Sequence, residues 1–446
     1  MLNKLLFKHI DNSALIVFRI IFGFLITAEA FGAIATGWVR NVMVEPKFTF
    51  NFIGFEFLQP LVGNYMYLHF VIMGVFGICV MLGYKYRFAI IGYTLFWATA
   101  YFLQKSAYNN HYYLLIILCA IMALLPANKY LSVDAKNDPS IVEHSMPKWC
   151  SGILILQMFI VYTYGAIAKL YPDWISTSVM KIFMQAKKHY FLVGDILQEQ
   201  WMHYMLSYGG ILFDGLVIPL LLFKPTRKWA FLASIFFHMF NSAVFQVGIF
   251  PYMSLGLTIF FFEPKTIRNI FLKHKPLFDG IHYSEPKYKV LFLSILSIHF
   301  IIQLALPLRH HFFKDNVLWT EEAHRLSWRM MLRSKIGTAS FRVVTKDSIR
   351  ATKVVNLNNY LTTKQKRLVT THPDAIWQFA QILKKEYNSK GQEVEIYVQS
   401  SIRVNRRPYS LYIDPNVDLA KIEWNAFRHS NWILPSKLDE LQITNP

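Results

Sequence analysis

The sequence predicts a multi-pass α-helical membrane protein of about nine spans, followed by a C-terminal extramembrane α+β domain. Three properties of the 446 residues predict this class: 54% are apolar, only 16% are charged, and the mean hydropathy is +0.30. A soluble domain has roughly 25% charged residues, and a disordered chain combines low hydrophobicity with high charge. The composition excludes both, and we expect residues 1–307 to form the transmembrane domain and residues 308–446 the extracytoplasmic one.

Nine stretches reach or approach the roughly 20 apolar residues that a helix needs to cross a bilayer. They are Ala14–Ala33, Tyr65–Leu82, Phe88–Leu103, Tyr112–Leu125, Ile153–Leu170, Tyr204–Phe223, Trp229–Val247, Tyr252–Phe262 and Val290–Pro307. The fourth and eighth are short, so tilted or re-entrant helices also fit them. The segment Phe52–Val62 is too short to span and contains Glu56 and Pro60, which predicts an interfacial position.

Lys and Arg residues are divided unequally between alternate loops. If the N-terminus is cytoplasmic, the inside loops carry 15 of them, not counting Lys289 at the edge of the last span, and the outside loops carry six. Cytoplasmic loops of membrane proteins are enriched in Lys and Arg. We therefore expect a cytoplasmic N-terminus, nine spans, and a C-terminal domain outside the cytoplasm.

Residues 308–446 differ in composition from the rest of the chain, with 22 Lys and Arg against 13 Asp and Glu. A helix is predicted after Thr371, which is placed as its N-cap, because Pro373 follows and apolar residues then recur at helical spacing. Alternating apolar residues predict one strand around Val394–Val398 and another around Phe341–Val343. These elements define the expected α+β domain.

Several polar residues lie in or beside the apolar stretches, where desolvation makes a functional role the first hypothesis. They are Arg19, Glu29, Asn109, Asn110, His111, Lys169, Asp214, His238 and Asn241. Each also has a structural interpretation. Lys169 can anchor a helix end, His238 and Asn241 share one helical face and can join helices, and Asn109 can cap a helix.

Common catalytic and metal motifs are missing from the sequence. The three cysteines lie in or beside apolar stretches without metal-ligand spacing, so no metal site is predicted. The net charge of +19 is spread over loops and the tail, so we expect no nucleic-acid partner. The apolar stretches make the lipid bilayer the expected partner.

Eight stretches form an ordered pattern along nearly the whole chain. They are VFRIIFGF (Val17–Phe24), SAYNNHYYL (Ser106–Leu114), FIVYTYGAIAKLYPDW (Phe159–Trp174), GGILFDG (Gly209–Gly215), FFHMFNSAVFQVGIFPY (Phe236–Tyr252), SWRMM (Ser327–Met331), SIRVNRRPYSLYIDPNVD (Ser401–Asp418) and WNAFRHSNWILP (Trp424–Pro435). Together they resemble the vitamin K-dependent γ-glutamyl carboxylase family, whose membrane part is also called the horizontally transferred transmembrane domain. The compact length resembles bacterial members, so a bacterial inner membrane is expected.

The resemblance implies a carbon–carbon lyase that oxidises reduced vitamin K, either phyllohydroquinone or a menaquinol, with O2 to the epoxide. The base formed in this oxidation takes a γ-proton from a protein glutamate, and CO2 then adds to give γ-carboxyglutamate. On the family's motifs, Lys169 deprotonates the hydroquinone, while Asn110 and His111 bind its oxygen. An ammonium cannot act as a base, and burial in apolar surroundings favours the neutral lysine that this role needs.

The remaining predicted site residues divide between the two substrates. His238 and Asn241 are predicted to bind the quinol with Asn110 and His111, and His111 is the second predicted catalytic residue. In the basic tail and loop, Asn405, Arg407 and His189 are predicted to bind the glutamate substrate. Two other functions stay open: a quinol epoxidase without carboxylation, and a non-enzymatic quinone- or lipid-binding membrane protein.

Overall fold

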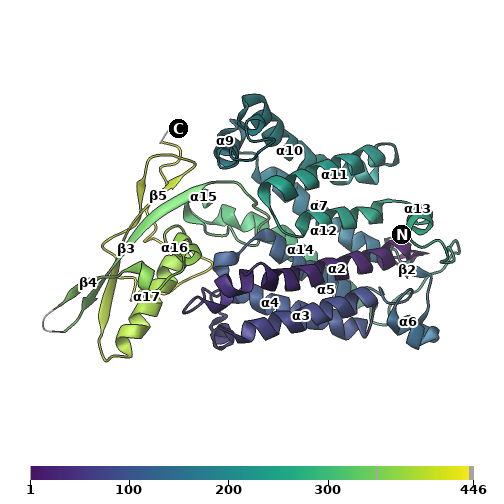
Figure 1. Cartoon of the computed structure of the whole chain (residues 1–446), viewed down its shortest axis with the longest axis horizontal. Coiled ribbons are helices and arrows are strands. Elements are labelled where there is room, and N and C mark those ends of the chain that lie inside the picture. The colour runs from purple at the N-terminus through teal and green to yellow at the C-terminus, as the bar shows by residue number, and fades with distance from the viewer. Residues whose placement is uncertain (1, 348–349, 441–446) are drawn as a thin grey trace.

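The computed structural model describes residues 2–347 and 350–440, and it divides into a helical part and a part built on a sheet (Figure 1). The helices of the first part are α1 (Leu2–Phe7), α2 (Ser13–Ala35), α3 (Tyr65–Leu82), α4 (Tyr86–Leu103), α5 (Asn110–Leu124), α6 (Val133–Asn137), α7 (Trp149–Ala168), α8 (Pro172–Ile175), α9 (Ser178–Gln185), α10 (Gln200–Leu222), α11 (Lys224–Phe245), α12 (Phe250–Leu257), α13 (Pro264–Phe271) and α14 (Lys289–Leu308). A short ribbon of β1 (His9–Asp11) and β2 (Ser145–Pro147) joins the start of the chain to the segment before α7.

All nine stretches expected to span the membrane are helical, although their ends shift by a few residues. In the described part of the chain, five helices are long and apolar enough to cross a bilayer. These are Ser13–Ala35, Tyr65–Leu82, Trp149–Ala168, Gln200–Leu222 and Lys289–Phe312. The number nine therefore stays a prediction. The expected interfacial segment contains a short 3₁₀ helix, Glu56–Leu61, whose Phe57 is 71% exposed.

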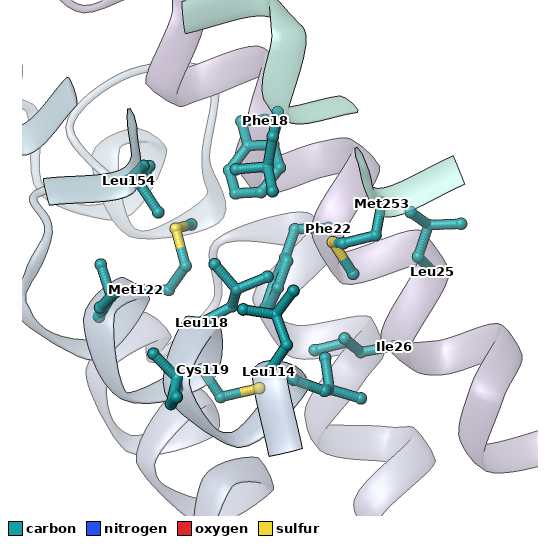
Figure 2. Close-up of a cluster of buried hydrophobic side chains, with 14 of the residues drawn as sticks. Phe18, Phe22, Leu25, Ile26, Leu114, Leu118, Cys119, Met122, Leu154 and Met253 are labelled. Atoms are coloured by element: carbon teal, nitrogen blue, oxygen red, sulfur yellow. The ribbon is translucent and has the colours of Figure 1, made fainter. Parts of the chain in front are cut away.

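The centre of the helical part is a continuous apolar core. Phe18, Phe22 and Ile26 of α2 are buried in one cluster with Leu114 and Leu118 of α5, and Figure 2 shows these side chains gathered between the helices. Lipid supplies little hydrophobic driving force between helices, so close packing of such side chains carries the association.

The second part is a four-stranded antiparallel sheet with helices on one face. Its elements are α15 (Val317–Thr320), β3 (Lys335–Thr345), β4 (Thr352–Val354), α16 (Thr363–Val369), α17 (Pro373–Asn388), β5 (Val394–Val404) and β6 (Ser410–Ile413). The strand order is β4-β3-β5-β6, and β3 pairs with β5 from Lys335↔Val404 to Thr345↔Val394. The predicted alternation places Phe341 and Ile396 on the buried face, where the Phe341 ring packs edge-on against Phe379 of α17 at 4.8 Å.

One predicted helix start needs correction. The N-cap of α17 is His372, not Thr371, and no side chain caps this helix. The Thr371 hydroxyl instead donates to the Arg367 carbonyl at 2.5 Å and closes the preceding helix, α16. Thr371 was misassigned because the sequence does not show that another helix ends two residues earlier.

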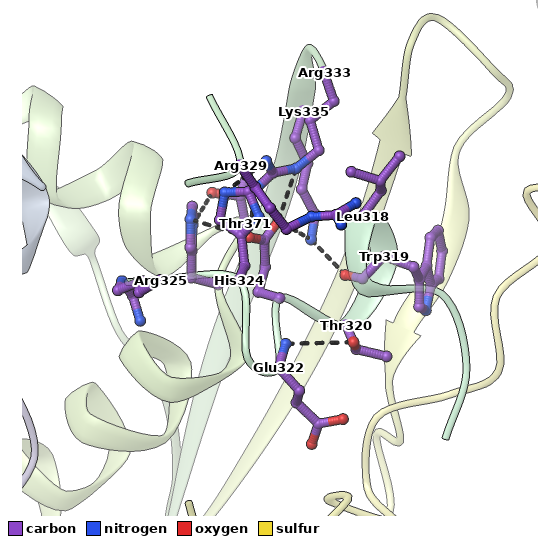
Figure 3. A network of polar contacts seen from close by, with 12 residues as sticks. Leu318, Trp319, Thr320, Glu322, His324, Arg325, Arg329, Arg333, Lys335 and Thr371 are labelled. Atoms are coloured by element: carbon purple, nitrogen blue, oxygen red, sulfur yellow. Dashed lines mark hydrogen bonds and ion pairs between the residues drawn. The ribbon is translucent and has the colours of Figure 1, made fainter. Parts of the chain in front are cut away.

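A buried polar network joins the two parts. Lys105, between α4 and α5, pairs with Asp374 of α17 at 2.5 Å, and Arg325 pairs with the same carboxylate at 2.7 Å. Burial alone would raise the pKa of Asp374, but these two cations outweigh it and hold the pKa well below its ordinary value. Figure 3 shows the neighbouring contacts, including Lys335, which donates to the Trp319 carbonyl at 2.6 Å.

Candidate functional site

A cavity of about 480 Å³ lies among α7, α10 and α11, near the C-terminal end of α7. Most of its wall is apolar or aromatic. Its titratable and amide-bearing lining residues are His111, Tyr162, Lys169, Asp214, His238 and Asn241. Leu212 and Leu216 on α10 and Phe236 on α11 also line it, and they are 59%, 47% and 69% exposed. The cavity therefore opens between α10 and α11 onto the apolar outer surface of the helical part.

Lys169 occupies the end of α7, where it is the C-cap residue and is 8% exposed. Its ammonium donates to the Gly165 carbonyl at 3.1 Å and to the carboxylate of Asp214, and it lies 5.6 Å from the Trp174 ring centroid. A cation at a helix C-terminus is favoured by about 0.3–1 kcal/mol. The helix end and the carboxylate together hold the amine at the cavity wall.

Two imidazoles approach the cavity from other helices. His111, in the first turn of α5, stacks on Phe250 of α12 with the ring centroids 4.1 Å apart. His238 of α11 is 2% exposed, and its Nε2 shares a hydrogen bond of 2.8 Å with the Tyr162 hydroxyl. Its Nδ1 is buried and has no partner among the described residues. Asn241 lines the cavity one turn further along α11.

The structure thus brings together Lys169, His111, His238 and Asn241, four of the residues singled out from the sequence. Asn110 lies outside the cavity lining. Its amide donates to the Arg329 carbonyl at 3.0 Å and accepts from the Tyr108 hydroxyl at 2.9 Å. Asn110 therefore joins the two parts of the molecule, while Asn109 caps α5 by accepting from the Tyr112 amide at 2.7 Å.

The predicted glutamate-binding residues lie apart from the cavity. Asn405 donates to Asp173 at 2.7 Å, and Arg407 makes a two-pronged contact with the same carboxylate at 2.6 and 2.8 Å. Asp173 lies in α8, four residues after Lys169. His189 is exposed in the loop after α9, with its ring against Tyr190.

A second hollow of about 490 Å³ adjoins the cavity and shares Phe183, Phe245 and Met331 with it. Its cationic lining residues are Lys187, Arg403 and Arg406. Arg403 stacks its guanidinium over Tyr409 at 5.1 Å, and its Nε is buried without a partner among the described residues. Arg403 was not predicted from the sequence. Strand alternation places it on the more exposed face of the sheet, but alternation does not show which other element lies against that face.

Two family models match the chain. Residues 7–265 match the HTTM domain, which defines the helical part as a membrane domain of that class. Residues 288–439 match the vitamin K-dependent gamma-carboxylase lumenal domain. The chain therefore belongs to the vitamin K-dependent gamma-carboxylase family. No solved structure matches it.

Proposed function

We propose that this protein oxidises reduced vitamin K with O2 to the epoxide and couples the oxidation to γ-carboxylation of protein glutamate with CO2. Phyllohydroquinone and menaquinol are the candidate quinols. One observation carries the proposal: Lys169, His111, His238 and Asn241 converge on a single apolar cavity that opens to the outer surface of the membrane part.

The cavity fits a naphthohydroquinone with an isoprenoid tail. Ligand sites usually measure about 300–1,000 Å³ and are mostly apolar, with a few placed polar groups. Here the apolar wall between α10 and α11 suits a ring and tail that arrive from lipid, and the polar residues suit the two ring oxygens. When bound and oxidised, the quinol supplies the strong base that removes the glutamate γ-proton.

The protein's own residues hold and move protons around that group. Lys169 takes a proton at Nζ, the imidazoles of His111 and His238 offer ring nitrogens for hydrogen bonds, and Asn241 orients an oxygen through its amide. The aromatic wall excludes water, which would otherwise quench a strong base.

The glutamate substrate is assigned to the second hollow. Lys187, Arg403 and Arg406 give it a positive potential beside the cavity, and the unpartnered Nε of Arg403 suits a carboxylate. Asn405 and Arg407 then serve the site indirectly, because they bind Asp173. His189 lies two residues from Lys187 in the sequence, and we propose that it also helps to bind the glutamate substrate.

We propose the topology expected from the loop charges: nine spans, a cytoplasmic N-terminus and an extracytoplasmic sheet domain in a bacterial inner membrane. Two variants, Lys136→Cys and Lys390→Cys, test this topology by reaction with a membrane-impermeant maleimide on intact cells. We expect labelling at position 390 alone. Labelling of position 136 instead would invert the topology.

The central experiment supplies reduced vitamin K, radiolabelled bicarbonate and a glutamate-containing peptide, and follows both the epoxide and the label. The wild-type protein should form both products, Lys169→Ala should form neither, and the exposed Lys390→Ala should match the wild type. An active Lys169→Ala variant would overturn the assignment. Epoxide without label would favour the epoxidase alone, and no quinol turnover would favour a carrier.

A further inference from the structure

Asp214 is the feature of the cavity that the proposed function leaves without a role. It lies in the middle of α10, is 7% exposed, and accepts from the Lys169 ammonium. Among the described residues that line the cavity, Asp214 is the one carboxylate. A Cβ at Gly165 would come within 3.1 Å of its Oδ2, so the missing side chain at Gly165 gives the carboxylate its place against α7.

This contact creates a problem for a lysine that must act as a base. An ammonium paired with a carboxylate has no lone pair to accept a proton. Removing its proton to solvent would leave the carboxylate as an unpaired charge in apolar surroundings, which is strongly unfavourable. Moving the same proton from Nζ to Oδ2 instead converts an ion pair into a neutral pair, and the net charge of the site does not change.

We propose that Asp214 is the proton acceptor for Lys169, and that the two side chains act as one base. This inference rests on the proposed role of Lys169. In the step, one N–H bond of the ammonium breaks and an O–H bond forms on Asp214. The neutral amine then accepts the proton of an acidic hydroxyl held in the cavity. An ammonium, a carboxylic acid and a ligand oxyanion result, so the summed charge stays at zero throughout.

The other titratable groups around the pair come from three elements. Tyr162 belongs to α7, His111 to α5 and His238 to α11, and all three line the same cavity. His238 already shares its Nε2 hydrogen bond with Tyr162. Asp173 contacts Arg407 and Asn405 rather than the cavity. Asp214 is therefore the carboxylate that contacts the Lys169 amine directly and can take up its proton.

The direct test detects the proton rather than turnover. Infrared difference spectra are recorded under argon before and after binding of reduced menadione, a naphthohydroquinone without a tail. The wild type should gain the carbonyl band of a protonated carboxyl group, and carbon-13 labelling of aspartate should shift that band. Asp214→Asn should lose it, and Lys169→Ala should not gain it. A wild-type protein that binds the probe without this band would overturn the proposal.

A second readout is the pH profile of epoxide formation. Asp214→Asn should lose about 100-fold in kcat near neutral pH and recover about tenfold per pH unit as hydroxide from solvent takes the proton that Asp214 accepts in the wild type, while Asp214→Glu should keep the wild-type shape. A uniform loss at every pH would show that Asp214 only positions Lys169, and would also overturn the proposal.

The control is Asp11→Asn, which removes the carboxylate of a still more deeply buried pair with Lys275, at 2.7 Å, outside the cavity lining. This variant should keep the infrared band and the pH profile, so general loss of folding is separated from loss of the proton acceptor. If the wild type forms no epoxide while the band appears, the proposed function fails and the proton transfer stands.

Discussion

Lys169 owes its position to residues from both parts of the molecule. Asp214 contacts its amine, and Asp173, four residues later, is held by Asn405 and Arg407 of the sheet part. The Trp174 indole donates to the Ser207 carbonyl at 3.0 Å and fixes the same segment from α10. The sheet part therefore supports the candidate base as well as carrying the proposed glutamate site.

Arg407→Lys tests this support. Lysine keeps the charge but cannot make the two-pronged contact that Arg407 makes with Asp173. We expect kcat for epoxide formation to fall about tenfold, because small displacements of a reacting group are costly, with KM for the glutamate peptide unchanged. Initial-rate kinetics separate the two constants. A rise in peptide KM alone would restore Arg407 to the glutamate-binding role expected from the sequence.

Arg403→Ala tests the second hollow. Loss of this guanidinium should raise the peptide KM about tenfold, equivalent to 1.4 kcal/mol, and leave KM for the quinol unchanged. Arg342→Ala is the matched control, since Arg342 also lies on the exposed face of the sheet and stacks over a tyrosine, Tyr397, at 5.3 Å, but does not line the hollow. Equal effects of both variants would refute the assignment.

Site residues could be predicted from the sequence where a motif carries its own chemistry, and not where a distant partner decides the role. Lys169 and His111 were placed by motif and do line one cavity. Asn110 belongs to the same motif as His111, and Asn405 belongs to the motif in the tail, yet their amides bind groups 219 and 232 residues away in the sequence. The sequence does not show such distant partners. The motif therefore could not predict that Asn110 binds the Arg329 carbonyl and lies outside the cavity lining.

At the scale of elements, α2 and α3 pack closely because glycines remove side chains from their contact. A Cβ at Gly23 of α2 would lie 2.4 Å from the Met81 Cα of α3, and one at Gly77 would lie 2.6 Å from the Thr27 hydroxyl. Small residues at helix contacts are the usual means of close approach in membranes. Hydropathy predicted both helices, but it does not show which faces meet.

Gly23→Ala should lower the thermal stability of the detergent-solubilised protein. The new methyl group meets backbone, which cannot rotate away, and overpacking of this kind destabilises by about 1–3 kcal/mol. Gly32→Ala lies on the same helix with nothing within 4 Å of its new Cβ, so it should melt at or above the wild-type temperature. Both variants can be followed by circular dichroism. Equal melting of the two would contradict the packing argument.

For the helices and strands, too, local patterns could be predicted from the sequence and distant partners could not. Long apolar runs predicted the nine helices, because their period and hydropathy are local properties. The pairing of β3 with β5 was not predictable, since the 48 residues between the two strands include two helices and a third strand. The start of α17 was misplaced by one residue because a neighbouring helix ends there.

At the scale of the whole molecule, the two parts meet through a buried ion pair between Lys105 and Asp374 and through apolar contacts such as that of Phe48 with Phe379. Asp374 is shared by Lys105 of the helical part and Arg325, and within the sheet part Glu321 pairs with Arg333 and Lys335. Removing one partner of such a buried pair costs about 3–5 kcal/mol, because the other charge is left uncompensated. Loss of charge on any of these groups should therefore weaken the junction.

His372 should make this junction sensitive to acid. Burial lowers the pKa of His372 to about 3, with the charge of Glu321 opposing the shift only in part. An unfolded chain takes up this proton near pH 6.5, so the stability contributed by the neutral ring is complete above that pH and is lost as the pH falls toward 3. We expect a loss of roughly 2–4 kcal/mol over this window. His372→Gln should flatten the dependence of the melting temperature on pH, and the exposed His189→Gln should leave it unchanged. A steep acid dependence that persists in His372→Gln would place the sensitive group elsewhere in the molecule.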